Sequence, residues 1–345
     1  MKKWIGWIIA IFALIAISQV VTSSMRSGLE QSLSQACYRP VTIRSARVIL
    51  PVGILLTGID VPKVKGEVAA PFSVEAIRAT LSLNGLGQGQ AAAALEIRSP
   101  SVYLEWTREL KKAIRGGGLL PQQQAGVPVS ELTIQNGHVI LKDETVLPPS
   151  TWDLQQVKAH YQISPQQNYE YSISGILFDD SGKEQGTLTV DGSGVVDQHL
   201  EIHSILEHSD VRKISGYFRD VLGAMPDQGS LKMESRITIK NGVALAHNEV
   251  TAENLRFPVD AQTTIGMDGN RLVQLLSDAE GKFHLAFNVT GKLGENMDWS
   301  DLAASAMRET LQQAMARGIQ KALESNNDAM PASESLQNSM DSLGR

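Results

Sequence analysis

The chain has 345 residues, 42% of them hydrophobic, and a net charge of −6 because 37 acidic residues outnumber 31 lysines and arginines. This balance argues against a nucleic-acid partner, since phosphate binding requires a concentrated basic surface. Cys37 is the only cysteine, which excludes an intramolecular disulfide, so a hydrophobic core must stabilise the fold.

An uncharged apolar segment occupies residues 4–21, directly after Lys2 and Lys3. A helix of this length, rising about 1.5 Å per residue, is roughly 27 Å long, close to the ~30 Å hydrocarbon core of a bilayer. Positive residues stay on the cytoplasmic side, so we expect residues 1–3 in the cytoplasm and the body across the membrane. The sequence therefore predicts a single-pass protein of the cell inner membrane, with its body in the periplasm if the source is a Gram-negative bacterium.

The same segment also fits a cleaved secretory signal. Ala16, Ile17 and Ser18 form a small-x-small cleavage pattern at the end of an apolar h-region. Both interpretations export the body, so they differ only in whether the protein stays tethered to the membrane.

A connector, residues 22–40, leads to a strand-rich domain at residues 41–295. The connector has a helical pattern that places Leu29 and Leu33 on one side. Gly58 interrupts an early strand and indicates a bulge. The predicted strands cover residues 41–56 with a break at Pro51 and Gly53, then 72–83, 93–98, 101–106, 152–163, 169–178, 186–190, 198–206, 229–240, 242–257 and 282–293. Residues 115–127 predict a loop and residues 211–222 a short helix ended by Gly223.

Asn136-Gly137 separates two runs of alternating polarity, residues 129–135 and 138–142. An Asn-Gly pair in this setting is a strong signal for a β-hairpin turn, which we therefore predict here. Asp191-Gly192 is interpreted as a turn between strands in the same way.

The segment at residues 296–324 is predicted to contain an amphipathic helix, because residues 300–323 repeat apolar side chains at three- and four-residue steps. This helix has three interpretations: it packs on the sheet, it covers the sheet as a lid, or it docks on a partner. Residues 325–345 show no such period, and we expect a disordered tail.

Together these patterns predict a mainly β fold class: a long curved antiparallel meander sheet, with an N-terminal transmembrane helix, a short internal helix and a C-terminal amphipathic helix. One face of the sheet is expected to be apolar, because hydrophobic and polar side chains alternate within residues 282–293. Two interpretations stay open. Either the helices cover this face completely, or part of it remains an open apolar trough.

The apolar span and two later segments resemble the AsmA-like proteins of the bacterial envelope. These segments are residues 54–62, ILLTGIDVP, and residues 131–143, ELTIQNGHVILKD, and the likeness extends over residues 1–295. The resemblance implies a taco-shaped β-groove, inner-membrane anchoring and a part in moving or accommodating lipids between envelope membranes. It carries no catalytic residues. A dozen strands about 4.8 Å apart would give a groove of only about 58 Å, so spanning an envelope would need a partner, an oligomer or a shuttle.

No catalytic, cofactor-binding or metal-binding residues are predicted, and we expect no enzyme activity. His199 and His203 lie about 13 Å apart along a strand, which is too far to share one ion. The glycine run at residues 85–89 lacks the helix and the acidic partner that dinucleotide binding requires. An envelope hydrolase stays a third interpretation, which would require a compact acid-base cluster in a closed pocket.

We therefore expect a protein that binds lipid acyl chains in an apolar β-groove and takes part in envelope lipid transport or homeostasis. The expected partners are membrane lipids, the inner membrane and a second envelope protein or another copy of the chain. The alternative is a non-enzymatic structural or assembly factor for outer-membrane or other envelope components. The candidate lipid-facing residues are Leu132, Ile134, Leu231, Met233, Ile237, Ile239, Phe283, Leu285, Phe287 and Val289.

Overall fold

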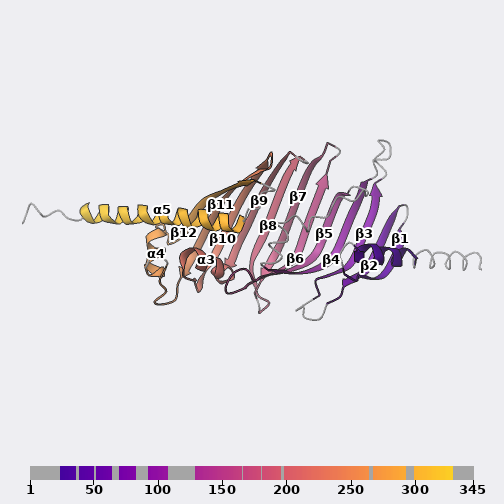
Figure 1. Ribbon diagram of the computed structural model, residues 1–345, viewed down its shortest axis with the longest axis horizontal. Coiled ribbons are helices and arrows are strands. Elements are labelled where there is room, and N and C mark those ends of the chain that lie inside the picture. Colours follow the sequence, from indigo (N-terminus) through magenta and orange to yellow (C-terminus); the bar gives the residue numbers. More distant parts are fainter. Residues whose placement is uncertain are drawn as a thin grey trace, which may run out of the picture.

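The structure is a computed structural model that describes residues 24–35, 39–49, 52–63, 70–82, 92–107, 129–164, 166–179, 181–195, 198–263, 267–292 and 299–328. Within these ranges twelve strands form one sheet, and each strand pairs with its neighbours in the chain (Figure 1). The strands are β1 (Thr42–Ile49), β2 (Gly53–Val61), β3 (Phe72–Ser82), β4 (Ala92–Trp106), β5 (Val129–Asp143), β6 (Ser150–Ile163), β7 (Asn168–Phe178), β8 (Glu184–Val195), β9 (His199–Asp210), β10 (Gln228–Lys240), β11 (Val243–Arg256) and β12 (Phe283–Lys292). The predicted mainly β fold class is confirmed.

The sheet is mixed, which corrects the prediction of a purely antiparallel meander. β4 and β5 pair in parallel, with Ile97 opposite Ile134, whereas the other neighbouring strands are antiparallel. A parallel pair requires a connection of about a dozen residues or more, so that the chain can return to the starting edge. Positions 107–128, between the two strands, supply that length.

The predicted hairpin at Asn136-Gly137 is wrong, because β5 runs unbroken through both residues. A two-residue type I′ turn requires positive φ at both central residues. Asn136 has φ 53°, but Gly137 is not among the described glycines with positive φ, and the pairing with β6 shifts at Gly137. The Asn-Gly pair therefore forms a β-bulge within one strand.

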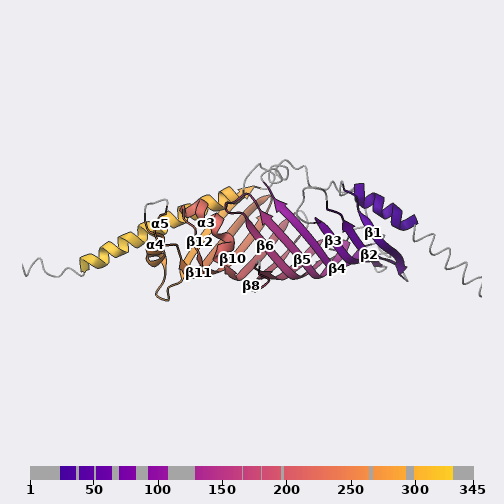
Figure 2. The ribbon, with the colours of Figure 1, turned by 90° about the horizontal axis from the view of Figure 1, so that it is seen from below.

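Residues with positive φ recur in neighbouring strands: Gly58 in β2, Ser99 in β4, Asn136 in β5 and Gln156 in β6, all between 47° and 59°. Asn136 and Gln156 lie at register shifts, in the β5–β6 and β6–β7 pairs, whereas the register is the same on both sides of Gly58 and Ser99. Gly58 is required in its place, because a β-carbon there would overlap the Arg44 side chain. Bulges bend a strand and increase its twist. The sheet is bent accordingly, and its strands cross in projection in Figure 2.

Two other predicted interruptions are also parts of continuous strands. Residues 93–98 and 101–106 belong to the single strand β4, which passes through Ser99 at φ 47°. β8 continues through Asp191-Gly192 to Val195, so the predicted turn there is wrong.

Helices lie at both ends of the sheet (Figure 1). At the N-terminal end residues 24–35 are helical, and Leu29 and Leu33 pack on a core of β1–β3, as the connector pattern predicts. Ile59 and Val74 in this core are each 2% exposed. This end of the sheet is therefore covered by the chain itself.

The C-terminal end is covered by one 3₁₀ turn and three α-helices. The turn is η2 (Val211–Ile214), and the helices are α3 (Ser215–Leu222), α4 (Gly269–Leu276) and α5 (Trp299–Asp328). Gly223 ends α3 in a left-handed conformation, as predicted, and α4, capped by Asp268, was not predicted. α5 packs on β12 and against α3 and α4, with Leu311 only 2% exposed, and continues beyond the sheet (Figure 1).

Several predictions lie outside the described residues. These are the membrane segment at residues 4–21, the loop at 115–127 and most of the tail, residues 329–345. The first residues of the predicted tail are helical instead, since α5 continues to Asp328. Among the described residues, no helix combines the length and the apolar character that a membrane span requires.

Candidate functional site: an apolar sheet face

One face of the sheet carries hydrophobic side chains across many neighbouring strands, and we call it the apolar face. Residues paired across two strands project to the same side, so the register defines the rows of each face. One row runs from β2 to β8 and contains Leu56, Ile77, Ile97, Ile134, Ala159, Ile173 and Val190. The next row continues to β12 and contains Ala79, Leu95, Leu132, Tyr161, Tyr171, Gly192, Ile202, Ile237, Ala246 and Val289.

The opposite face is polar over the same strands, and we call it the polar face. A single row on it contains Thr133, His160, Ser172, Asp191, His203, Arg236, His247 and Asn288. His203 bonds Glu234 at 2.9 Å, and the hydrogen bonds that the His247 ring makes to the side-chain oxygens of Asn288 and Glu249 raise the pKa of His247. The strong contrast between the two faces indicates that the polar face is the solvated side of the sheet.

The two ends of the apolar face are buried, and its middle is buried only in part: Val157 and Leu177 are each 6% exposed, whereas other side chains there are not buried. The hydrophobic cores lie at β1–β3 and under α3–α5, and neither includes Leu132, Ile134, Ile173 or Val190 among its described members. These central side chains are only half-buried. Leu104, on the same face of β4, is 46% exposed. The described part of the chain therefore leaves a hydrophobic strip over β4–β8 partly open to solvent.

The structure places all the predicted lipid-facing residues on this face but divides them by exposure. Leu132, Ile134, Ile237 and Ile239 are half-buried, and Met233 is 38% exposed. The others are between 1% and 6% exposed within the core under α5: Leu231, Phe283, Leu285, Phe287 and Val289. The prediction that these five face lipid is corrected, because they contact protein instead.

Three tyrosines form a feature of the apolar face that the sequence did not single out. Tyr161 of β6 lies beside Tyr169 of β7, with ring centroids 6.4 Å apart. The phenol ends of Tyr169 and Tyr171 lie over Gly194 and Gly192 of β8, where a β-carbon would overlap them. We call Tyr161, Tyr169 and Tyr171 the tyrosine shelf. An alternation of glycine in one strand with tyrosine in the next was the available signal, but the prediction of a turn at Gly192 concealed it.

The hydroxyl groups of the shelf have no protein hydrogen-bond partner among the described residues. Burial raises the pKa of Tyr169 and Tyr171, and each is raised further by a neighbouring tyrosine. Both phenols are therefore neutral at pH 7 and keep a proton to donate. The shelf adds hydrogen-bonding capacity to an otherwise hydrophobic region.

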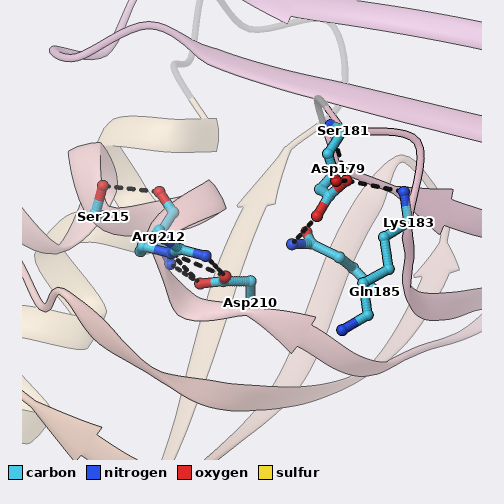
Figure 3. A network of polar contacts seen from close by, with 7 residues as sticks. All are labelled: Asp179, Ser181, Lys183, Gln185, Asp210, Arg212 and Ser215. Atoms are coloured by element: carbon cyan, nitrogen blue, oxygen red, sulfur yellow. Dashed lines mark hydrogen bonds and ion pairs between the residues drawn. The ribbon is translucent and has the colours of Figure 1, made fainter.

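A separate polar hollow of about 390 Å³ lies where β6–β9 meet η2 (Figure 3). Arg212 makes a two-pronged contact with Asp210, which also accepts from the Arg212 amide. Asp179 accepts from the Ser181 hydroxyl and from the amides of Ser181 and Lys183. Since these groups bond one another, the network stabilises the turn and the start of η2.

The histidines that were considered for metal binding have other partners. His199 bonds Glu201 at 3.0 Å and His203 bonds Glu234 at 2.9 Å, both on the polar face. Within the described ranges no group of three or more His, Cys, Asp or Glu side chains is arranged to hold a metal ion.

Comparison with known proteins adds no assignment. No family model matches the chain, and no curated protein matches it.

Proposed function

We propose that this chain is an inner-membrane-anchored periplasmic protein whose bent sheet forms a groove for lipid acyl chains, and that it takes part in envelope lipid transport or homeostasis. The observation that carries the proposal is the partly open hydrophobic strip over β4–β8, between two ends covered by helices. Residues 4–21 supply the anchor, and the AsmA-like resemblance supports the same assignment.

The dimensions of the strip suit one acyl chain. Neighbouring strands are about 4.8 Å apart, so the five strands β4–β8 extend over roughly 19 Å. One leaflet of a bilayer gives an acyl chain about 15 Å, half of the ~30 Å hydrocarbon core. Each methylene removed from water is worth about 0.8 kcal/mol, so covering one chain provides on the order of 10 kcal/mol. A groove that is closed at both ends favours holding a lipid over passing it along the whole sheet.

The first test is lipid identification after purification of the full chain in mild detergent. We expect about one co-purified phospholipid or more per chain. Ile134→Asp and Ile173→Asp place a charge on the half-buried strip and should reduce bound lipid at least tenfold, because lipid contact would desolvate the carboxylate. Ile173→Thr keeps the β-branched shape and should give a smaller loss.

The neighbouring polar-face positions provide matched controls. Gln135→Asp faces Arg98, and Ser174→Asp faces Lys158, so both new carboxylates have a cationic neighbour. Both controls should retain lipid, and circular dichroism should show a folded β protein in every variant. Absence of lipid from the wild-type protein, or equal lipid in Ile173→Asp and Ser174→Asp, would contradict the proposal and favour the assembly-factor alternative.

A further inference from the structure

The tyrosine shelf lies at one rim of the sheet. Tyr161 comes two residues before the end of β6, Tyr169 is the second residue of β7, and Gly194 directly precedes the last residue of β8. The shelf is therefore next to the β6–β7 and β8–β9 connections and not in the middle of the strands.

The apolar face changes character away from this rim. Along β7 the side chains on this face are Tyr169 and Tyr171, then the half-buried Ile173, and finally Leu177, which is 6% exposed in the core under α5. Tyrosine combines a hydrophobic ring with a polar end and is favoured where an apolar region meets water, whereas Ile and Leu suit hydrocarbon alone. A ligand that lies along the face would thus have its polar end at the tyrosines and its hydrocarbon over the aliphatic residues.

The shelf offers hydrogen-bond donors without a positive charge. The phenols of Tyr169 and Tyr171 are neutral and have no hydrogen-bond partner among the described residues, whereas Ser235 and Asn248, also on this face, bond each other at 2.8 Å. Leu132 pairs with Tyr161 and Ile163 with Tyr169, and beyond the glycines of β8 the next residues are Leu200 and Ile202, so none of these neighbours carries a charge. A donor in such surroundings favours a neutral acceptor, since binding a phosphate would bury an unpaired anion.

We infer that the tyrosine shelf binds the ester carbonyl groups of a glycerolipid whose acyl chains occupy the hydrophobic strip. The inference rests on the proposed function and adds the class of lipid and its orientation. Ester carbonyls lie between the headgroup and the chains, which matches the position of Tyr161, Tyr169 and Tyr171 between the rim and the aliphatic residues. The headgroup then extends past the rim into solvent, so we expect little dependence on headgroup charge.

The test compares ester-linked with ether-linked lipids, which differ only in the carbonyl acceptors. The full chain is incubated with detergent micelles that hold equal amounts of dioleoyl-phosphatidylcholine and its dioleyl ether analogue, and bound lipid is quantified by mass spectrometry. Wild-type protein should enrich the ester lipid about three- to tenfold, as expected for one or two net hydrogen bonds. The same ratio should appear with phosphatidylglycerol headgroups.

Removing only the hydroxyl groups should abolish this preference. The triple variant Tyr161→Phe, Tyr169→Phe and Tyr171→Phe keeps the rings over the glycines, so it should fold and retain its ether lipid. Its ester lipid should fall about three- to tenfold, which brings the ester-to-ether ratio near one. Tyr103→Phe is the control, because Tyr103 bonds Glu105 on the polar face at 2.9 Å. An equal ratio in lipid-bound wild-type protein, or an unchanged preference in the triple variant, would overturn the inference alone. Failure to bind either lipid would instead overturn the proposed function.

Discussion

The phenol ring of Tyr171 occupies the space that a β-carbon at Gly192 would need, and the two residues are paired across β7 and β8. Glycine weakens an isolated strand because it has no side chain to pack, and a cross-strand aromatic ring compensates by covering it. The pair therefore keeps β8 in the sheet at a position where the sequence alone favours a turn.

Gly192→Ala should destabilise the protein by about 1–3 kcal/mol, because the new methyl group would displace the ring of Tyr171. Urea unfolding followed by circular dichroism measures the change in the free energy of unfolding. Gly28→Ala is the control: Gly28 lies in the helix at residues 24–35 with no atom within 4 Å of the added carbon, and alanine there should stabilise by about 0.5–1 kcal/mol.

A double-mutant cycle attributes the effect to the pair. In a Tyr171→Ala background the overlap is gone, so Gly192→Ala should cost less than about 0.5 kcal/mol and the coupling should be at least about 0.5 kcal/mol. Equal costs of Gly192→Ala in both backgrounds would show that the ring does not constrain this glycine.

Asp210 should contribute a stability that depends on pH. Burial acts to raise the pKa of Asp210, but hydrogen bonds and charge from Arg212 outweigh it and lower the pKa below its ordinary value. A carboxyl with a lowered pKa stabilises the folded state above its unfolded pKa, about 3.9, and loses that effect as the pH falls through its folded pKa. The contribution should be at most about 1 kcal/mol, because the Arg212 side chain is 66% exposed.

Asp210→Asn tests this dependence, since asparagine can still accept from the Arg212 amide but carries no charge. The variant should have a lower melting temperature than the wild type at pH 6, and the difference should disappear toward pH 3. It should also shrink in 1 M salt, which screens the ion pair. A difference that stays constant from pH 6 to pH 3 would assign the effect to packing instead of charge.

The sequence predicted the strands better than their connections. Alternation of hydrophobic and polar residues depends only on a sheet with one apolar side, and it located β3, β7, β10 and β12 to within about two residues at each end. α5 was also predicted, because its apolar repeat is long. α4 has only eight residues and too few turns to show a period.

The predicted site was located on the correct face but not at the correct depth. Phe283 and Ile134 occupy equivalent faces of their strands, yet Phe283 is 3% exposed in the core under α5 and Ile134 is half-buried outside it. Which strands a helix covers depends on contacts between residues far apart in the chain. Local polarity patterns hold no information on those contacts, so the sequence could not separate the covered end from the open strip.

Asn136 shows why bulges were mistaken for turns, and it allows a direct test. Positive φ is accessible to glycine and asparagine, and both turns and bulges use it, so the Asn-Gly dipeptide alone does not separate a turn from a bulge.

At φ 53° a β-branched side chain is strained, so Asn136→Val should cost about 1–3 kcal/mol of folding stability, whereas Asn136→Gly should stay within about 0.5 kcal/mol of the wild type. Ile140→Thr, on the same strand and beyond the register shift, controls for a general change in β5. Because the bulge contributes to the bend of the sheet, Asn136→Val should also reduce co-purified lipid more than a control of equal stability loss does. A Val variant as stable as the Gly variant would show that Asn136 does not adopt the bulged conformation.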